Sequence, residues 1–401
     1  MLNTIEEKLL YDIDPLLQDT DRQAYVAQQM AKLTYRELSF LKTKLREYLL
    51  TMRRLDASDI EIGGSTCRDS IWLRIQGVKK LRPEFGTWTP DQSDILLQSI
   101  LNDAQKDRLL KNRAVDFSYF IEHEGKTRRW RATLYFDLGH LALNMRTIAS
   151  DIYPYNQLGF HQNISRSFSL QHEKQGLILF TGITGSGKST SMDSILDANN
   201  RTTNGHIVII GDPIEYIHKS NKCLVRHREV GTDVLSFKDG AIQSLRQDPD
   251  IIVVGEMRDP ETIMTCLEIS DTGHKVFSTL HTGSAVETID RIVAECPTQE
   301  QQRVRIRLAD QLRVIVSQKL IPNKSDRLQL VKEIMLVSSA IKAAIRNENT
   351  HEIYQMISEN GKLGMITLEQ DLTRLCKQGI ITQDTAIDYA NNKNRIKELL
   401  S

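Results

Sequence analysis

A glycine-rich segment near the middle of the chain constrains the fold more than any other feature. Residues Gly182–Ser189 read Gly-Ile-Thr-Gly-Ser-Gly-Lys-Ser, follow the apolar run Leu177–Thr181 and precede a stretch with helical spacing. Glycines in such a segment let the backbone curl so that its N–H groups point inward at the amino end of the helix. The pattern, between a strand and a helix, predicts a phosphate-binding loop.

The loop assigns roles to its polar residues. Lys188 is expected to reach the β and γ phosphates, and the hydroxyl of Ser189 is expected to coordinate Mg²⁺. A nucleoside triphosphate with Mg²⁺ is therefore the expected ligand. The residues predicted to bind it are Gly182, Thr184, Gly185, Ser186, Gly187, Lys188, Ser189 and Thr190.

Short β-branched runs recur around and after the loop and alternate with helical stretches. This alternation predicts an α/β fold in which helices cover both faces of a parallel sheet. In such sheets, ligands bind at the carboxyl ends of the strands. The predicted strands are Leu177–Thr181, His206–Ile210, Ile251–Val254 and Val276–Thr279.

Two carboxylates follow predicted strands, where a phosphate-bound metal and an attacking water would lie. Ile251–Val254 is followed by Gly255 and Glu256, a Walker B pattern with Gly where Asp is more usual, so Glu256 is expected to hold Mg²⁺ through a water. Glu215 follows the preceding predicted strand and is suited to orient and deprotonate the attacking water. Asp212, closer to that strand, is interpreted as a structural turn residue.

Two histidines bracket the predicted strand Val276–Thr279. His274 precedes the strand and His281 follows it, so one or both could sense the γ-phosphate. A histidine beside a strand is more often only packed there. The residues alone leave both interpretations open.

Charge and cysteine content limit the other classes of function. The 52 basic residues are balanced by 52 acidic residues, so no net positive field attracts a nucleic-acid backbone. The amino terminus lacks a signal-peptide pattern and no apolar stretch approaches the ~20 residues of a spanning helix, so a membrane role requires a partner. Scattered cysteines without a Cys-x-x-Cys pair indicate reduced packing residues rather than disulfides or a zinc site. They are Cys67, Cys223, Cys266, Cys296 and Cys376.

The part of the chain before the loop has a different pattern. Tyr25–Arg54 has apolar residues at helical spacing and predicts one or two amphipathic helices. Asp91–Leu110 predicts a further helix between short strands, so this part is a mixed α/β domain. Its predicted strands are Ile60–Ile62, Ile71–Val78, Trp130–Phe136 and Leu141–Ile148. Pro154 and its turn-forming neighbours then mark a linker.

The last part of the chain is predicted to be helical after the apolar run Val331–Val337. Leu368, Leu372 and Leu375 are spaced to share one face of a helix, and Gly379 is placed to end it.

Four segments stand in a characteristic order after the loop. They are Leu245–Asp250, Gly255–Asp259, Thr272–His274 and Ser278–Thr282. Together they resemble the Walker B element, the His box and the segment between them in the type II/IV secretion ATPase superfamily, which includes PilT, GspE and VirB11. The resemblance runs from Ala57-Ser58-Asp59-Ile60 to about Asn392, which is most of the chain.

The resemblance implies an architecture and a set of site residues. It implies an amino-terminal PAS-like α+β domain, a RecA-like ATPase domain with a helical carboxyl-terminal tail, and a ring of six subunits that hydrolyses ATP. Glu215 matches the family's catalytic base, while His281 and His274 match its His box. Arg131 and Arg146 match arginines of the amino-terminal domain that reach the γ-phosphate and stabilise its transition state.

The same resemblance divides the chain and marks two departures from the family pattern. Gly211 stands where the family usually has Glu, and Gly139 stands where many members have another Arg. The predicted divisions are 1–55 as a helical extension, 56–149 as the PAS-like domain, 150–162 as the linker, 163–330 as the ATPase domain and 331–401 as a mainly helical region. The extension is longer than in the retraction ATPases.

The resulting hypothesis is a hexameric cytoplasmic ATPase, bound peripherally to inner-membrane components of a type IVB secretion or conjugation apparatus. The amino-terminal extension and Gln311–Pro322 favour this machine, resembling DotB-like ATPases, over a type IV pilus retraction motor, which is the alternative. A DNA translocase with a similar core is a second alternative, although zero net charge argues against nucleic acid as a direct ligand. The intact Lys188, Ser189, Glu256 and Glu215 argue against a catalytically silent subunit.

Overall fold

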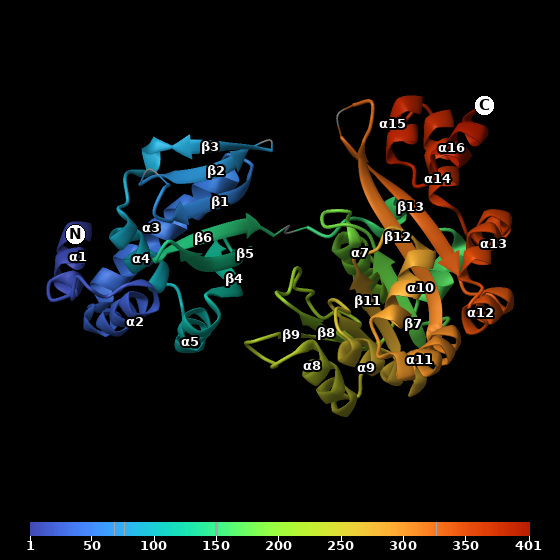
Figure 1. Ribbon diagram of the computed structural model, residues 1–401, viewed down its shortest axis with the longest axis horizontal. Coiled ribbons are helices and arrows are strands. Elements are labelled where there is room, and N and C mark those ends of the chain that lie inside the picture. The colour runs from blue at the N-terminus through green and yellow to red at the C-terminus, as the bar shows by residue number, and fades with distance from the viewer. Residues whose placement is uncertain (68, 76, 149–150, 326) are drawn as a thin grey trace. The chain divides into compact units, whose positions relative to one another are not determined.

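The computed structural model of the protein describes residues 1–67, 69–75, 77–148, 151–325 and 327–401. The chain divides into two compact units, Met1–Ser150 and Asp151–Ser401. Figure 1 shows that each unit is built around one sheet, the first coloured blue to teal and the second green to red. Residue 149, the predicted end of the PAS-like domain, and residue 150, the predicted start of the linker, lie outside the described residues.

The first unit contains a six-stranded antiparallel sheet in the order β3-β2-β1-β6-β5-β4. Alternate residues such as Ile60, Trp130 and Met145 are fully buried, and helices contact β1, β4 and β6. The strands are β1 (Ala57–Gly63), β2 (Ile71–Ile75), β3 (Val78–Arg82), β4 (Ala114–His123), β5 (Lys126–Asp137) and β6 (His140–Thr147). The helices are α1 (Leu2–Leu10), α2 (Asp19–Gln29), α3 (Tyr35–Arg54), α4 (Pro90–Gln98) and α5 (Asp103–Asn112), with short 3-10 turns η1 (Met30–Lys32) and η2 (Pro83–Phe85).

The prediction of one helix over Asp91–Leu110 is wrong because two capping signals interrupt it. After α4, the hydroxyl of Ser99 donates a hydrogen bond of 2.6 Å to the carbonyl of Leu96. Asn102 then caps α5, since its side chain accepts the N–H of Gln105 at 2.8 Å and its own N–H donates to the Gln105 side chain at 2.9 Å. This reciprocal pair satisfies backbone groups that a continuous helix would use differently, so two helices result.

Residues 1–55, predicted as a separate extension, pack into the core of the first unit. Ile5 on α1 and Leu41 on α3 are fully buried, and they belong to the same apolar cluster as Ile60 and Leu73 of the sheet. The segment therefore folds together with the residues that follow it.

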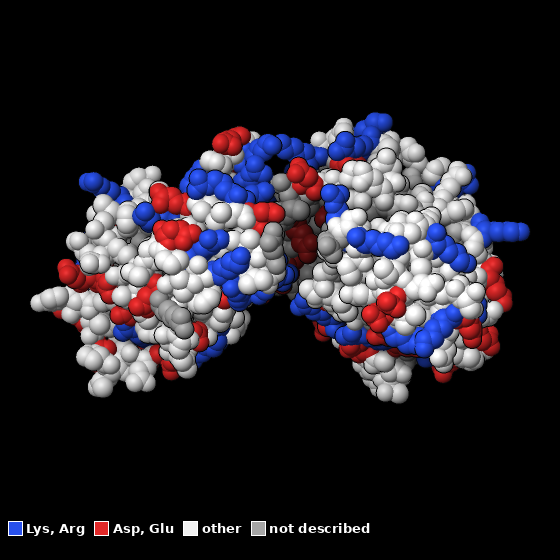
Figure 2. Space-filling view, turned by 90° about the horizontal axis from the view of Figure 1, so that it is seen from above, with Lys and Arg blue, Asp and Glu red and all other residues white. Residues whose placement is uncertain are grey.

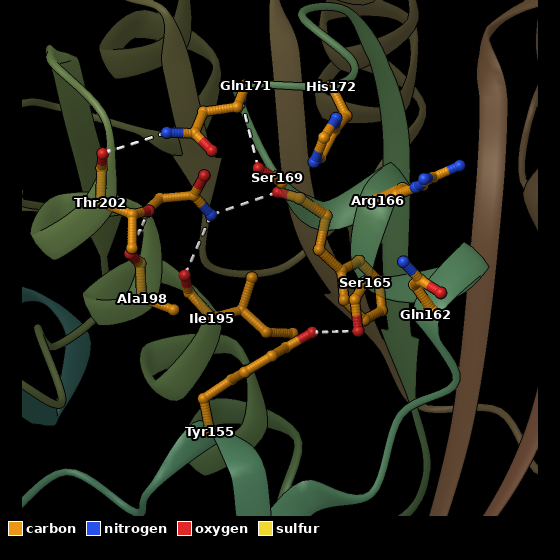
Figure 3. A pocket seen from close by; sticks show the side chains of 12 residues that line it. Tyr155, Gln162, Ser165, Arg166, Ser169, Gln171, His172, Ile195, Ala198 and Thr202 are labelled. Carbon is orange, nitrogen blue, oxygen red and sulfur yellow. Dashed lines mark hydrogen bonds between the residues drawn. The ribbon is translucent and has the colours of Figure 1, made fainter.

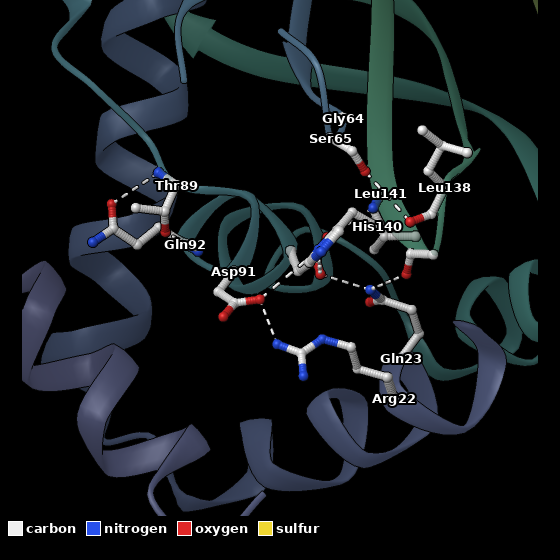
Figure 4. Close-up of polar contacts among 12 residues, drawn as sticks. Arg22, Gln23, Gly64, Ser65, Thr89, Asp91, Gln92, Leu138, His140 and Leu141 are labelled. Carbon is white, nitrogen blue, oxygen red and sulfur yellow. Dashed lines mark hydrogen bonds and ion pairs between the residues drawn. The ribbon is translucent and has the colours of Figure 1, made fainter. Parts of the chain in front are cut away.

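A polar network fastens α2 to the turn between β5 and β6 (Figure 4). The buried carboxylate of Asp94 accepts a hydrogen bond of 2.7 Å from Gln23 and lies 2.8 Å from Nδ1 of His140, while Gln23 also donates to the carbonyl of Gly139 at 3.2 Å. Gly139 has a φ of +85°, and a Cβ there would lie 3.0 Å from Oδ1 of Asp19. Glycine at this position adopts the left-handed φ without strain and lets α2 dock against the turn.

The second unit contains a seven-stranded sheet in the order β13-β12-β7-β11-β10-β8-β9, in which every pairing is parallel except that of the edge strand β13 with β12. The four strands predicted from the sequence are adjacent at its centre. The strands are β7 (Gly176–Thr181), β8 (Gly205–Gly211), β9 (Cys223–Glu229), β10 (Ile251–Val254), β11 (Lys275–Leu280), β12 (Leu312–Pro322) and β13 (Leu328–Leu336).

Helices cover both faces of this sheet, as predicted (Figure 1). Leu177 and Leu179 of β7 lie in one apolar cluster, while Ile178 and Phe180 lie in another, so the strand is buried on both sides. The helices are α6 (Gln162–Phe168), α7 (Lys188–Thr202), α8 (Phe237–Ser244), α9 (Pro260–Asp271), α10 (Ala285–Ala294), α11 (Thr298–Gln311), α12 (Ser339–Arg346), α13 (Ile353–Glu359), α14 (Leu368–Lys377), α15 (Gln383–Tyr389) and α16 (Lys393–Leu400). The 3-10 turns are η3 (Tyr155–Leu158), η4 (Leu245–Gln247), η5 (Thr350–Glu352) and η6 (Gly361–Leu363).

Two predicted boundaries differ from the structure. The predicted linker 150–162 includes η3, where Leu158 is buried and its carbonyl accepts a hydrogen bond from the ammonium of Lys332. The boundary at residue 330 falls inside β13, which pairs with β12 along its length. Both segments satisfy their apolar and polar groups within the second unit and therefore belong to it.

The carboxyl-terminal helices pack on β12 and β13. Leu368, Leu372 and Leu375 of α14 are buried together with Ile321 and Val331 of the sheet, as their spacing predicts. The tail therefore forms a small apolar cluster of its own beside the main core.

A buried carboxyl joins this tail region to α10. Oε1 of Glu333, on β13, accepts the N–H of Ala285 at 2.7 Å, and the side chain is almost fully buried. Burial raises the pKa of Glu333 to about 7; the bond from Ala285 opposes this increase, and the neighbouring charge of Glu369 adds to it.

Replacing Glu333 with Gln should remove a pH-dependent loss of stability. A carboxyl with a folded pKa of about 7 and an ordinary value of 4.5 favours folding below pH 4.5, and this contribution is lost as the pH rises through 7. The loss amounts to roughly 3 kcal/mol. Between pH 5 and pH 8, the midpoint of thermal unfolding should fall less for Glu333→Gln than for the parent. The exposed Glu359→Gln is the control, and equal pH dependence in the Glu333 variant and the parent would contradict the assignment.

Candidate functional site

The glycine-rich loop joins β7 to α7 in a conformation that requires its glycines. Gly182, Gly185 and Gly187 have φ values of +143°, +81° and +88°. A Cβ at Gly182 would lie 2.4 Å from the carbonyl oxygen of Gln318, which no side chain allows. The curled loop followed directly by the amino end of α7 is the geometry expected of a phosphate site.

Lys188, the first residue of α7, turns back over the loop. Its ammonium donates hydrogen bonds to the carbonyls of Gly182 at 2.7 Å and Ile183 at 3.1 Å. Burial lowers the pKa of Lys188, while the charges of Glu256 and Glu215 oppose that decrease. The cation is therefore held at the loop with two carboxylates in its field.

The remaining loop residues differ in exposure. Thr184, Gly185 and Thr190 are exposed, and Ser189 is half-buried in the first turn of α7. Ser186 is buried, and its Oγ has no hydrogen-bond partner among the described residues. A buried hydroxyl with an open donor at the amino end of a helix fits an anionic ligand.

Glu256 follows β10 and is held from two sides. Its Oε2 lies 2.7 Å from Nε of Arg258, and its Oε1 lies 3.2 Å from Nε2 of His281. The hydroxyl of Thr279 on β11 also donates to the carbonyl of Gly255 at 2.7 Å, which fixes the end of β10 against β11. The carboxylate thus has a defined position at the edge of the sheet.

His281 follows β11 at the same edge. Burial lowers its pKa; the charge of Lys188 adds to this decrease and that of Glu256 opposes it. A neutral imidazole can donate one hydrogen bond to Glu256 and accept another, which suits a group that reports on a neighbouring phosphate.

His274 is not part of this site. β7 and β11 run parallel, and Lys275 pairs with Gly176 at the start of β7, whereas the loop follows Thr181. His274 therefore lies at the opposite edge of the sheet, roughly 20 Å away at about 3.3 Å per residue, where its Nδ1 lies 3.1 Å from the hydroxyl of Thr272. The structure thus does not place His274 beside the loop, because the full length of β11 separates it from His281.

Glu215 leaves the sheet beside Glu256. β8 pairs with β10 in parallel register, with Ile210 opposite Val254, so the segments after both strands emerge at the same edge. The side chain of Glu215 is exposed, and its charge acts on Lys188.

Gly255 and Gly211, at the ends of β10 and β8, both lie in crowded surroundings. The N–H of Gly255 donates to the carbonyl of Ile210 at 2.9 Å, and a Cβ at Gly255 would lie 3.1 Å from that oxygen. A Cβ at Gly211 would lie 2.8 Å from Cδ1 of Ile214. The close approach of the ends of β8 and β10 crowds Gly255, whereas Gly211 is crowded by Pro213 and Ile214 of its own segment.

Arg131 and Arg146 lie opposite each other on β5 and β6 of the first unit. Asp59 on β1 is the next residue in this row, and its buried carboxylate accepts a hydrogen bond of 2.8 Å from Nε of Arg146. Arg74 on β2 follows, with its Nε 3.7 Å from the same carboxylate. Arg131 is exposed and the Arg146 side chain is 60% exposed, so this row presents cations on the open face of the sheet.

Basic side chains continue to the edge of that sheet. Lys79 on β3 stands opposite Arg74, and Lys80 and Arg82 follow on the same strand. Figure 2 shows Lys and Arg gathered over the part of the first unit where β3 lies.

Two other features do not contribute to the phosphate site. Asp91, Asp94 and His140 could together hold a metal, but Asp94 already accepts hydrogen bonds that fasten α2. A cavity of about 410 Å³ lies between α6 and the far half of α7, where Tyr155 and Ile195 line it (Figure 3). Ile195 stands two turns beyond the start of α7, so the cavity is about 10 Å along the helix from the loop.

The family of the chain follows from this site and from comparison with known proteins. The family profile described as "Type II/IV secretion system protein" matches residues 131–329. The type IV pilus retraction ATPase PilT of Pseudomonas aeruginosa is 39% identical over 299 residues, covering 75% of this chain and 85% of PilT. The chain belongs to the type II/IV secretion ATPase family.

Solved structures of related ATPases share the fold. The crystal structure of the pilus retraction motor PilT with bound ADP has a TM-score of 0.78 at 37% identity, covering 88% of this chain and 98% of that chain. The ATPase DotB of Legionella pneumophila has a TM-score of 0.74 at 25% identity, covering 87% and 94%. The predicted RecA-like α/β fold and the predicted ATP hydrolase are therefore confirmed. No helix among the described residues is long and apolar enough to cross a membrane.

Sequence reasoning gave no role to two residues that hold the predicted ones in place. Arg258 follows Glu256 by two residues and forms an ion pair with it. A positive charge so close to the predicted Walker B carboxylate could have indicated this ion pair from the sequence. Asp59 binds Arg146 across 87 residues, and only strand pairing brings them together.

Titration of His281 should report the charges around it. The charge of Lys188 lowers its pKa and that of Glu256 raises it, so Lys188→Ala should raise the pKa and Glu256→Gln should lower it. Proton NMR of the full-length protein with labelled histidine measures both shifts. The resonance of the exposed His351 should not move in either variant, and shifts of the same sign for both variants would contradict the geometry.

Proposed function

We propose that this protein is an ATP-driven motor of the type IV pilus retraction type. The observation that carries the proposal is the similarity to PilT, which extends over most of both chains. It is supported by a site that retains a loop lysine, a Walker B glutamate, a glutamate after β8 and a His-box histidine. A motor needs such a site to convert hydrolysis into domain movement.

The comparisons favour this machine over the type IVB secretion apparatus that the sequence reading placed first. PilT exceeds DotB in both identity, at 37% against 25%, and TM-score, at 0.78 against 0.74. In the sequence analysis, the amino-terminal extension favoured the secretion hypothesis. In the structure this segment packs into the first unit, so it no longer distinguishes a secretion motor from a pilus motor.

We infer the following roles in ATP hydrolysis. The N–H groups of the loop and Lys188 bind the phosphates, and Glu215 orients and deprotonates the attacking water. Ser189 and Glu256 offer the hydroxyl and carboxylate oxygens that Mg²⁺ prefers, and the ion would neutralise phosphate charge there. His281, whose Nε2 lies 3.2 Å from Oε1 of Glu256, links that carboxylate to the γ-phosphate.

Arg131 and Arg146 are proposed to stabilise the charge that develops on the γ-phosphate. Two guanidinium groups opposite each other on neighbouring strands repel, and the single carboxylate of Asp59 offsets only part of this charge. An anion that binds at the open face would relieve this repulsion. We therefore expect the two arginines to bind a phosphate group more strongly than they bind solvating water.

The arginines and the loop belong to different units, which is consistent with catalysis that depends on how units close. We propose a ring of six subunits acting on inner-membrane components of the machine, with the protein on the cytoplasmic side. A DNA translocase remains the alternative from another class, and ATPase activity that rises on adding DNA would favour it.

Lys188→Ala should abolish ATP hydrolysis. Removing the cation that reaches the phosphates lowers turnover by more than a hundredfold in a site that works by electrostatic stabilisation. Release of inorganic phosphate by the purified full-length protein is the measurement, and turnover like that of the parent would overturn the motor assignment. In a piliated host, cells carrying only Lys188→Ala should keep surface pili and lose twitching; lost secretion with normal twitching would favour the secretion machine.

Arg131→Ala and Arg146→Ala should lower kcat about tenfold or more while leaving ATP affinity nearly unchanged. The reason is that both cations are proposed to act on charge that appears only in the transition state. Steady-state phosphate release and equilibrium binding of a fluorescent ATP analogue separate the two effects. Lys80→Ala, an exposed cation on the same unit, is the control, and equal effects of all three variants would place the arginines outside catalysis.

A further inference from the structure

A buried histidine after β8 connects the two elements that carry the proposed base and the phosphate loop. His218 is 4% exposed, and its Nε2 lies 3.0 Å from Oδ1 of Asp193. Asp193 is on α7, five residues after Lys188. The segment that leaves β8 is thereby tied to the helix that the loop begins.

The same segment is tied to the edge strand β9 on its other side. The N–H of His218 donates to Nε2 of His227 at 3.0 Å, and the two imidazole rings stack with centroids 6.1 Å apart and planes 6° apart. The ring of Tyr216 packs edge-on against His218 at 4.8 Å. Nearer β8, the N–H of Ile214 donates to Glu229 of β9 at 3.2 Å.

Glu215 lies between these two attachments. Ile214, immediately before it, is held by β9, and His218, three residues after it, is held by both β9 and α7. The exposed side chain of Glu215 therefore projects from a short bridge with both ends fixed. A displacement of either end would move its carboxylate relative to Lys188.

The contact between His218 and Asp193 is polar, although apolar packing at this place would stabilise the fold more. Nδ1 of His218 is buried and makes no hydrogen bond to any described residue, and a buried polar atom without a partner destabilises a fold. Asp193 lies at the border of solvent, with 18% of its side chain exposed. A directional contact of this kind specifies geometry more than it adds stability.

We propose that Asp193 and His218 are positioning residues, which set the place of Glu215 relative to the phosphate loop and thereby the rate of the hydrolytic step. They act through Glu215 and touch neither ATP nor the water. The inference rests on the proposed role of Glu215 as base. The variant Glu215→Gln distinguishes failure of the positioning inference from failure of the proposed role of Glu215 as base.

The test measures kcat, KM and thermal unfolding of the full-length protein. His218→Ala and Asp193→Ala should each lower kcat by roughly tenfold to a hundredfold, because a shift of about 1 Å in a catalytic group has an effect of that size. KM for ATP should stay within about twofold of the parent value. The double variant should be no slower than the slower single variant, because both changes break one contact.

Two further variants separate positioning from general support of the fold. His218→Gln carries an amide N–H near the place of Nε2 and should restore most of kcat. His206 is the matched control, since one of its ring nitrogens bonds the carbonyl of Gln247 at 2.8 Å and the other is buried without a partner, but it lies at the far end of β8. His206→Ala should keep the kcat of the parent.

The outcomes are decisive in both directions. Equal losses of kcat in His218→Ala and His206→Ala, additive losses in the double variant, or no rescue by Gln would overturn the positioning role. If His218→Ala does not fold, Asp193→Ala, which removes the acceptor and leaves the buried ring in place, carries the same test. If Glu215→Gln hydrolyses ATP like the parent, the role of Glu215 fails; if it is inactive while Asp193 and His218 variants retain full kcat, only the positioning inference fails.

Discussion

The parallel register of β7, β11, β10 and β8 is the constraint on which the rest of the structure depends. Because the strands point the same way and are paired residue by residue, whatever follows each of them emerges at one edge. Lys188, Glu256 and His281 meet there although they are far apart along the chain. The same register places His274 at the opposite edge of the sheet. Of the two histidines that flank β11, only His281 therefore lies beside the phosphate loop.

How much could be predicted follows from the range over which each signal acts. The loop and the four central strands are specified by runs of a few residues, and these were predicted nearly to their ends. The break between α4 and α5 is also local, but Asn102 and Gln105 signal a helix start only when read together. Contacts between distant elements, such as Arg146 with Asp59, leave no local signal and required the fold.

The amino-terminal helices illustrate a different limit. Their amphipathic spacing correctly indicated helices that bury one face, yet spacing does not say which surface receives that face. The receiver is the sheet of the same unit, and the network around Asp94 fixes α2 against the turn at Gly139. The left-handed φ of +85° at Gly139 favours glycine there, and a Cβ would also crowd the carboxylate of Asp19 at 3.0 Å.

The loop after His281 is held by more than its own strand. Nη1 of Arg291 on α10 donates to the carbonyl of His281 at 2.9 Å, and the side chain of Asn391 in the tail donates to the carbonyl of Gly283 at 3.2 Å. The N–H of Ala285 binds Glu333 of β13. Since His281 also contacts Glu256, a contiguous series of polar contacts joins the carboxylate at the phosphate site to the carboxyl-terminal helices. The edge of the sheet that carries the phosphate loop and the carboxyl-terminal helices therefore belong to the same unit. The row of cations that includes Arg131 and Arg146 belongs to the other unit.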